Sequence, residues 1–393
     1  MLVPVNMADP LQNALSALED QVGNIDQFAM RELGYQSVEA LHDALMGLQV
    51  DSVASAINQI KENGKGIIIA DQTGIGKGRQ AAAMIRWAAR NGYTPVFVTV
   101  KPQLFTDMYG DLADIGTNDI EPFIMNSDAA ISSPAGDKLF ANKASSHKRN
   151  LSSIAATGEL PDERNALFMT YSQINTENNQ RAALSALAPN AIVILDESHN
   201  ASGDSKTGEY MTSVLAQAKG VVYLSATYAK RPDNMPLYFK TDIGQAISDS
   251  SSLIEAMASG GLPLQTVIAN NLVKAGQMFR RERSYDGVSI NTIVDTESRE
   301  AHEALSDSVT EALRAIVDAD RMFHSVTVAS MQEDAEAAGE AVFDNAGNQA
   351  SESVDHTQFS SVVHNFVRQM LLGLKANAAA DRAIEALKRG EKP

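Results

Sequence analysis

The sequence predicts an α/β fold in which a mostly parallel sheet carries helices on both faces, followed by a mainly helical second half. Apolar runs typical of strands buried on both faces, such as AIVIL at 191–195 and GVVYL at 220–224, alternate with helical segments. These two strands, and a third at 67–70, are each followed directly by a polar signature. That arrangement is expected where ligands bind at the carboxyl ends of parallel strands.

The composition limits the class of protein. A chain of 393 residues is too long for one small core and suits roughly two or three domains. The chain has no cysteine, so it has no disulfide and no thiolate metal site, which fits a reducing cytoplasm. It contains no run of about 18 apolar residues that could cross a membrane. We therefore expect a cytoplasmic protein with no membrane contact.

The net charge of −17 argues at first against a nucleic-acid partner. The charge is unevenly distributed, however. Residues 296–356 hold 14 acidic residues and three arginines, a net charge of −11, so the remainder of the chain carries only −6. We predict that the acidic segment itself does not touch nucleic acid, because it would repel phosphates.

The patterns predict three regions. Residues 1–48 read as a leader of short helices, and residues 49–240 alternate strand and helix as in a nucleotide-binding lobe. Residues 241–393 are mainly helical, with a hairpin near 279–295 that turns at Asp286-Gly287.

Two finer predictions concern local structure. Asp9 and Ser37 are expected to cap helices of the leader. Residues 127–150 are rich in Ser, Ala, Lys and Asn without a clear period, so we expect an exposed loop or insertion there.

The stretch GIIIADQTGIGKGR at 66–79 has the composition of a phosphate-binding loop between a strand and a helix. Gly74 and Gly76 permit backbone angles that turn N–H groups inward, and the helix N-terminus adds partial positive charge. Lys77 is placed to reach the outer phosphates. Asp71 stands where the usual P-loop pattern has its first glycine, and Gly78 stands where it has a magnesium-binding hydroxyl. An ordinary glycine-rich turn is the alternative.

The other two strand ends carry DESH at 196–199 and SAT at 225–227. An acid at the tip of a buried strand across from a phosphate loop is where Mg²⁺ is held, which points to Asp196. Glu197 can orient and deprotonate water. Hydroxyl groups of the third signature can hydrogen-bond toward His199 and couple the two strand ends. A solvated turn and a helix cap are the alternatives for each motif alone.

Together these motifs resemble those of superfamily 2 helicases and translocases. DQTGIGKG resembles the motif I of Swi/Snf-type members, DESH a DEAH-type motif II, and SAT motif III. A closer similarity is to the strawberry notch family and its bacterial, phage and plasmid relatives. It is carried by IIIADQTGIGKGRQAA, FVTVKPQLFTDMYGDLADIG, ILDESHNA and LSATYAKRPDNM. In that family a glycine after the motif I lysine is normal.

The resemblance implies a RecA-like P-loop NTPase lobe with ATP and Mg²⁺ as cofactors, and Gln49 resembles a glutamine that reads adenine. The implied catalytic residues are Glu197, Lys77, Asp196 and His199, with Asp196 as the Mg²⁺ ligand. The implied ATP-binding residues are Gln49, Thr73, Gly74, Ile75, Gly76, Lys77, Gly78 and Arg79. Ser225 and Thr227 are expected to couple the strand ends, and Lys101, Pro102, Thr170 and Tyr171 to lie along a nucleic-acid track.

The resemblance continues toward the end of the chain. FRRERSYDGVSI is similar to the hairpin that follows the first ATPase lobe, and DRAIEALKRGEKP to the opening of a second RecA-like lobe. We therefore expect the N-terminal part of a longer enzyme whose second lobe, with its catalytic arginines, lies outside this chain. Phage and plasmid relatives often add a methyltransferase domain, so such a domain or partner is expected.

These observations favour the first lobe of an ATP-dependent helicase or translocase that acts on nucleic acid, DNA rather than RNA. The alternative is a nucleotide-binding regulatory or scaffolding module without motor activity. A ring-forming unfoldase fits less well, since such proteins lack DESH followed by SAT at this spacing. Arg280, Arg281 and Arg283 form a basic cluster, for which pairing with the acidic helices is favoured over nucleic-acid contact.

Overall fold

The structure is a computed structural model that describes residues 3–133, 136–142, 144–201, 206–246, 249–284, 286–287, 292, 294, 296, 298–338 and 359–391. The chain forms two compact units, Met1–Asp286 and Gly287–Pro393. No helix in the described part of the chain is long and apolar enough to cross a membrane.

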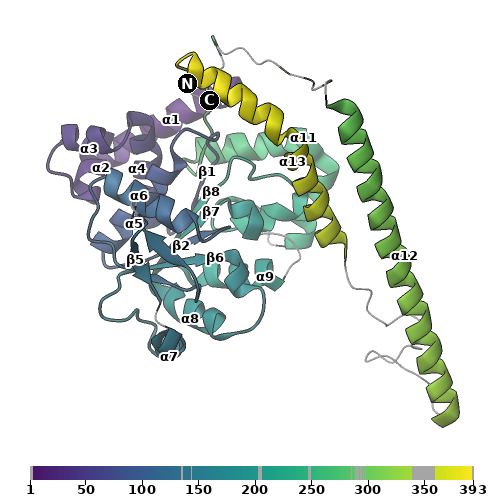
Figure 1. The fold of residues 1–393 in the computed structure, drawn as a ribbon. Helices are drawn as coiled ribbons and strands as arrows, with labels where there is room; N and C mark the ends of the chain where they lie inside the picture. Colours follow the sequence, from purple (N-terminus) through teal and green to yellow (C-terminus); the bar gives the residue numbers. More distant parts are fainter. Residues whose placement is uncertain are drawn as a thin grey trace. The chain divides into compact units, whose positions relative to one another are not determined.

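The first unit is built on a sheet of seven described strands, and each strand runs parallel to its neighbours. Helices lie on either side of this sheet (Figure 1). Across the sheet the order is β3 (Pro122–Ile124), β6 (Ala166–Thr170), β2 (Thr94–Thr99), β7 (Ala191–Asp196), β8 (Gly220–Leu224), β1 (Ile67–Ile69) and β9 (Met278–Phe279). The predicted α/β fold with a RecA-like parallel sheet is confirmed.

The central strands are apolar because they are covered on both faces. Every residue from Ala191 to Leu195 in β7 is buried, and so is every residue of β8. Polarity returns at Asp196, the last residue of β7. The sequence change from apolar to polar therefore marks the edge of the sheet where a ligand can reach the strand ends.

The described helices that follow or flank the strands in this unit are α4 (Gly47–Asn63), α5 (Lys77–Arg90), α6 (Leu104–Asp114), α8 (Asn179–Leu187), α9 (Lys206–Gln217), α10 (Ile243–Ala246) and α11 (Ser250–Lys274). Helix α5 packs on β2, β7 and β8 and contributes the fully buried Trp87 to the core. The Trp87 indole donates a hydrogen bond to Glu32 at 3.0 Å, which ties the leader to α5.

The leader consists of α1 (Val5–Val22), α2 (Ile25–Leu33) and α3 (Val38–Ala44). Ser37 caps α3 as predicted, and its hydroxyl accepts a hydrogen bond from the Ala40 N–H at 3.2 Å. The predicted cap at Asp9 is wrong. Helix α1 begins at Val5, so Asp9 lies inside it and Pro4 takes the capping position.

The described residues of 127–150 contain regular secondary structure, where an exposed loop or insertion was expected. Strands β4 (Ala130–Ser132) and β5 (Lys138–Ala141) form an antiparallel pair, and α7 (Ala144–Thr157) follows. Helix α7 packs on α8 and buries His147, Leu151 and Ile154. Only two of these three side chains are apolar, which explains why the helical period was not visible in the sequence.

Residues 241–286 lie in the same compact unit as the sheet. Helix α11 is kinked at Gly261, whose φ is 52°, and Pro263 follows the kink. Strand β9 joins the sheet edge parallel to β1. Within the rest of the hairpin expected at 279–295, residues 285, 288–291, 293 and 295 lie outside the described residues.

The second unit contains α12 (Arg299–Ala338) and α13 (Phe359–Lys388), which match the long helices expected in this half (Figure 1). Helix α12 exposes apolar side chains as well as acidic ones, among them Ile316 at 48% and Met322 at 69% exposure.

Candidate nucleotide-binding site

Three neighbouring strands end level with one another at one edge of the sheet. Ile69 of β1 pairs in register with Leu224 of β8, and Leu224 pairs with Asp196 of β7. Adjacent strands are about 4.8 Å apart, so β1 and β7 are separated by roughly 10 Å at this edge. The three motifs of the sequence therefore emerge side by side.

The loop between β1 and α5 has the backbone of a phosphate cradle. Gly74 and Gly76 have φ angles of 89° and 88°, which a residue with a side chain rarely adopts. Gly76 immediately precedes α5 and offers no side-chain cap, so the first N–H groups of the helix have no capping side chain. Thr73 is exposed on the loop and Ile75 is buried beneath it. Such a helix start is suited to bind an anion.

Lys77 lies at the centre of the site. Its Nζ atom donates a hydrogen bond to the backbone carbonyl of Asp71 at 2.7 Å. Burial lowers the pKa of Lys77, while the nearby carboxylates of Glu197 and Asp196 act in the opposite direction. The lysine and the two acids thus share one electrostatic environment, as the sequence predicted for a single site.

Asp196 and Glu197 have different surroundings. The Asp196 Oδ2 atom accepts a hydrogen bond from the Thr99 hydroxyl at 2.8 Å, and burial raises the pKa of this carboxyl. Glu197 is 40% exposed and has a φ of 49°, in the left-handed region. Among the described residues it is the one non-glycine with a positive φ. Strain of this kind persists where the surrounding structure imposes it and is frequent at active sites.

His199 connects the second strand end to the third. Its Nδ1 atom lies 2.9 Å from the Ser225 hydroxyl, 3.3 Å from the Thr227 hydroxyl and 3.5 Å from Glu197 Oε2. Burial lowers the pKa of His199, which favours a neutral ring. The predicted hydrogen bonds from the hydroxyl groups of SAT to His199 of DESH are present.

Gln49 is fully buried and supports the phosphate loop from below. Its Nε2 atom donates to the carbonyls of Ile75 at 3.1 Å and Gly76 at 3.3 Å. Its Oε1 atom accepts from the Met46 N–H at 2.9 Å. In this arrangement both ends of the amide are engaged by the protein, so Gln49 positions the loop.

Asp71 forms a buried ion pair with Arg281, which accounts for an acid at the position where the usual P-loop pattern has a glycine. Its side chain is fully buried, and Arg281 beside it is 4% exposed. The Arg281 Nε and backbone N–H donate to Asp71 Oδ1 at 2.9 and 3.0 Å. Gln80 donates to Asp71 Oδ2 at 3.2 Å, and Arg281 donates to the Ser52 hydroxyl at 3.2 Å. The acid faces inward to meet an arginine 210 positions later in the chain.

This pair corrects the expectation that the cluster at 280–283 binds the acidic helices. Arg281 pairs with the phosphate loop, and Arg280 pairs with Glu282 at 3.3 Å. No signal in a single sequence links Asp71 to Arg281. The unusual acid at the first loop position was the only sign that a partner was needed.

Gly78 and Arg79 meet acidic residues of α6. A side chain at position 78 would collide with the Asp111 carboxylate. Arg79 pairs with Asp114 at 3.1 Å and is therefore directed toward α6. The carboxylate of Asp111 occupies the space that a hydroxyl-bearing residue at position 78 would require.

The four residues assigned to a nucleic-acid track divide into two pairs. Lys101 is exposed and Pro102 is half-buried after β2. Thr170 and Tyr171 are 1% and 6% exposed, and their hydroxyls are engaged by Asn126 at 2.9 Å and the Asp196 carbonyl at 2.7 Å. The side chains of this second pair support the site from inside, so the expectation that they line an accessible track is corrected.

The donor set suits a nucleotide with Mg²⁺. The loop offers backbone N–H groups and Lys77 to phosphates, and Asp196 offers one carboxylate to a cation. Among the described residues, no group of three metal-binding side chains gathers anywhere. Mg²⁺ is usually held by one or two carboxylates together with substrate phosphates and water, so a single carboxylate at the position of Asp196 suits it.

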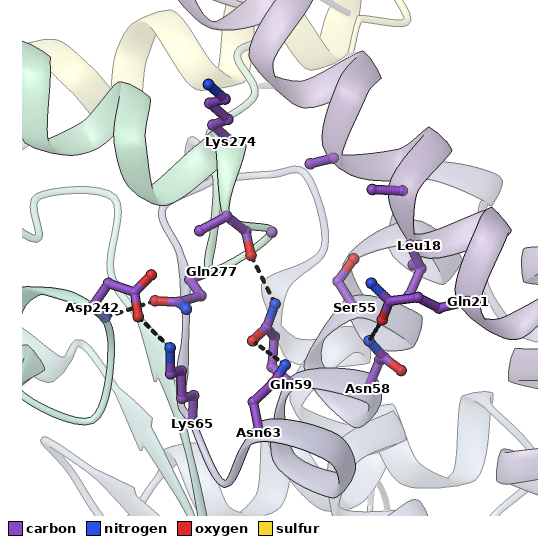
Figure 2. Close-up of a pocket in the computed structure, with 14 residues that line it drawn as sticks. Leu18, Gln21, Ser55, Asn58, Gln59, Asn63, Lys65, Asp242, Lys274 and Gln277 are labelled. Atoms are coloured by element: carbon purple, nitrogen blue, oxygen red, sulfur yellow. Dashed lines mark hydrogen bonds and ion pairs between the residues drawn. The ribbon is translucent and has the colours of Figure 1, made fainter. Parts of the chain in front are cut away.

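A cavity of about 230 Å³ lies at the opposite ends of the strands (Figure 2). Lys65, which precedes β1, pairs there with Asp242. Gln277, which precedes β9, accepts from the Asp242 N–H at 2.7 Å, and Gln59 donates to the Ala275 carbonyl at 2.8 Å. These bonds join α4 to the start of two strands, so the cavity is a structural junction away from the phosphate loop.

Comparison with known proteins gives the same assignment for most of the chain. A family model described as "P-loop containing NTP hydrolase pore-1" matches residues 29–307. Protein strawberry notch of Drosophila melanogaster is 26% identical over 328 residues, which are 75% of this chain and 18% of that protein. Protein strawberry notch homolog 1 of Gallus gallus is 27% identical over 275 residues, 62% of this chain and 20% of that protein.

Among solved structures, the Sulfolobus solfataricus SWI2/SNF2 ATPase core in complex with dsDNA matches with a TM-score of 0.43 and 12% identity, covering 68% of this chain and 53% of that chain. The chain spans about a fifth of the length of the strawberry notch relatives. The resemblance to the strawberry notch family seen in the motifs is confirmed by the family model and these relatives.

Proposed function

The chain belongs to the P-loop containing NTP hydrolase pore-1 family, and we propose that it supplies the first, ATP-binding lobe of an ATP-dependent helicase or translocase that acts on DNA. The observation that carries this proposal is the alignment of Lys77, Asp196 and Glu197 at one edge of the sheet, beside a glycine-shaped phosphate loop. We assign residues 49–240 to the lobe and residues 1–48 to a leader that braces it.

Each side chain has a role in this proposal. Lys77 leaves the Asp71 carbonyl to bind the outer phosphates of ATP, and Asp196 holds the cation in place. Mg²⁺, when bound, neutralises charge on the transferring phosphoryl group. Glu197 orients the attacking water and accepts its proton. His199 holds a hydrogen-bond link to Ser225, so that a change at the catalytic acid is transmitted to the third strand end.

Hydrolysis by this chain is expected to be slow without a second lobe. In two-lobed motors the second lobe supplies arginines that stabilise the transferring phosphoryl group, and one such arginine raises the rate by about 10³–10⁵. An enclosed site also strengthens the electrostatics that an open one loses to water.

A regulatory or scaffolding module without motor activity is the second candidate. The observation that favours it is α12, which combines acidic residues with exposed apolar side chains such as Ile316 and Met322. Such a surface suits a protein partner better than a phosphate backbone. In that case nucleotide binding would control the partner and nucleic acid would have no effect.

The test compares the rate of ATP hydrolysis with and without duplex DNA, single-stranded DNA and RNA. Both residues 1–393 and a longer protein that carries the second lobe are measured. Stimulation of the longer protein by DNA, abolished by Lys77→Ala, is the expected result. Lys77-dependent ATP binding without stimulation by any nucleic acid would favour the regulatory module, and absence of ATP binding would contradict both candidates.

A further inference from the structure

The backbone after β9 runs alongside the phosphate loop. The Ala70 N–H donates to the Phe279 carbonyl at 2.7 Å, and the Gln72 N–H donates to the Arg281 carbonyl at 2.9 Å. One step further, the Arg283 N–H donates to the Gln72 side chain at 2.8 Å. The parallel ladder between β1 and β9 thus continues past both strands, and residues 279–283 form one wall of the loop.

Side chains along this extended segment point alternately to its two sides. Arg280 and Glu282 lie on one side, where they pair at 3.3 Å and line a cavity together with Tyr228 and Lys230. Arg281 lies on the other side and enters the buried pair with Asp71. Arg283 follows on the same side as Arg281, one step nearer the carboxyl end of the sheet.

This position brings the Arg283 guanidinium onto the phosphate loop. Its Nη2 atom donates to the Gly74 carbonyl. A methyl group added to Gly74 would lie 3.4 Å from Nε and 3.5 Å from Cζ of Arg283, so the guanidinium covers the open face of that glycine. The side chain is exposed, and it pairs with no carboxylate among the described residues. A cation that no described carboxylate neutralises therefore stands at the rim of the phosphate cradle.

We propose that Arg283 is a second phosphate-binding cation, delivered in cis, that contacts the phosphates of a bound nucleoside di- or triphosphate. This inference rests on the proposed nucleotide-binding function. A guanidinium has five N–H donors and engages phosphate oxygens in pairs, so the bond to Gly74 leaves most of its donors available. Lys77 contacts the same loop at a different point, since its Nζ atom donates to the Asp71 carbonyl. Arg281 is the positioning residue, because its ion pair fixes the wall that carries Arg283.

The experiment titrates the 393-residue chain with ATP, ADP and adenosine, using displacement of a fluorescent ATP analogue. Arg283→Gln is expected to weaken ATP and ADP by about 10- to 100-fold, the effect of losing a charge-assisted hydrogen bond, and to leave adenosine unchanged. Arg283→Lys keeps the charge but not the paired donors, so it should recover only part of the affinity. Arg280→Gln is the matched control, since Arg280 is two positions away on the opposite side, and it should bind as the unmodified chain does.

Three outcomes overturn the inference, and the first two distinguish its failure from the failure of the proposed function. ATP binding that requires Lys77 but is unaffected by Arg283→Gln would refute the role of Arg283 and leave the proposed function intact. Absence of ATP binding by the unmodified chain would refute the proposed function and the inference with it. Equal loss of adenosine and ATP affinity in Arg283→Gln would show that the substitution acts through the fold and would also refute a phosphate contact.

Discussion

The phosphate loop and the acidic strand end meet at one edge of the sheet, but the protein anchors them differently. The loop is fixed by buried groups: Gln49 holds its carbonyls, and the Asp71–Arg281 pair fastens it to the wall at 279–283. Across the site, Glu197 is 40% exposed and held in a left-handed conformation, and its Oε2 atom lies 3.5 Å from His199 Nδ1. The loop fixed by buried groups, the rigid side, faces an exposed and strained acid, the responsive side.

The difference indicates that the phosphate loop already has its binding geometry, whereas the acidic strand end depends on what later covers it. A cradle that keeps its shape binds phosphate without reorganising, which is how oriented N–H groups are most effective. An exposed acid becomes effective when water is excluded around it. In this proposal the second lobe would complete the acidic side, while the loop side is already complete.

The largest effect is expected from Glu197→Gln, which removes the carboxylate on the responsive side and does not change the phosphate loop. In the longer protein proposed above, turnover should fall by about 10²–10⁴, the usual contribution of a positioned base. ATP affinity should stay within a few-fold, because the cradle does not depend on this side chain. Steady-state hydrolysis and equilibrium ATP binding are measured together. Loss of binding with the loss of turnover would contradict the assigned role.

The next largest effect is expected from Asp71→Ala, which removes the buried ion pair of the rigid side. Removal of one partner leaves Arg281 buried and unpaired, which should lower the free energy of unfolding by about 3–5 kcal/mol. Denaturant unfolding of the chain measures this change. The double variant Asp71→Leu, Arg281→Met removes both charges and should recover most of the stability. A double variant as unstable as Asp71→Ala would show that the pair itself, and not the orphaned charge, carries the energy.

Most contacts of the rigid side could not be predicted from the sequence, whereas those of the responsive side could. DESH and SAT are local signals that follow apolar strands, so Asp196, Glu197 and the link from His199 to Ser225 could be predicted from spacing alone. The partner of Asp71 depends on which strand joins the sheet edge, and the bonds of Gln49 depend on where α4 lies against the loop. That strand, β9, is two residues long and lies some 200 residues away, and no periodicity marks it.

The same reasoning applies to the elements. Long apolar strands of the central sheet have a signal that survives in any context, since burial on both faces requires it. Helix α7 and the short pair β4–β5 obtain their order from packing on α8 and on each other, so their sequence resembles a loop. The buried hydroxyls of Thr170 and Tyr171 belong to this second class, because their direction is set by Asn126 and Asp196.

A smaller effect is expected at Gly78, where the loop meets α6. Gly78→Ser restores the hydroxyl of the usual motif, but its side chain would collide with the Asp111 carboxylate. Crowding of this kind typically costs about 1–3 kcal/mol, so thermal unfolding should occur at a lower temperature. Gly78→Ser combined with Asp111→Ala should remove the collision and most of the loss. If the single variant is as stable as the unmodified chain, α6 yields and the departure at position 78 has no steric cause.

The smallest effect is expected at Asp196, the buried acid of the responsive side. Its substitution should stabilise the fold, whereas Asp71→Ala and Gly78→Ser should destabilise it. Burial raises the pKa of Asp196 above its unfolded value, so the protonated form is favoured by folding. That contribution to stability is fully present below the unfolded pKa and is lost as the pH rises through the folded pKa. At neutral pH the ionised carboxylate therefore opposes folding. Asp196→Asn removes this cost while its side-chain oxygen can still accept the Thr99 hydrogen bond.

The variant should consequently be more stable than the unmodified chain at pH 7, on the order of 0.5–2 kcal/mol, as is common when a functional charge is neutralised. At a pH below the unfolded pKa of an aspartate, about 3.9, the two should unfold alike, because both side chains are then neutral. Unfolding temperatures measured across this pH range test the sign directly. A variant that is less stable at pH 7 would mean that Lys77 and Thr99 already compensate the buried charge, and the acidic side would then be as firmly set as the phosphate loop.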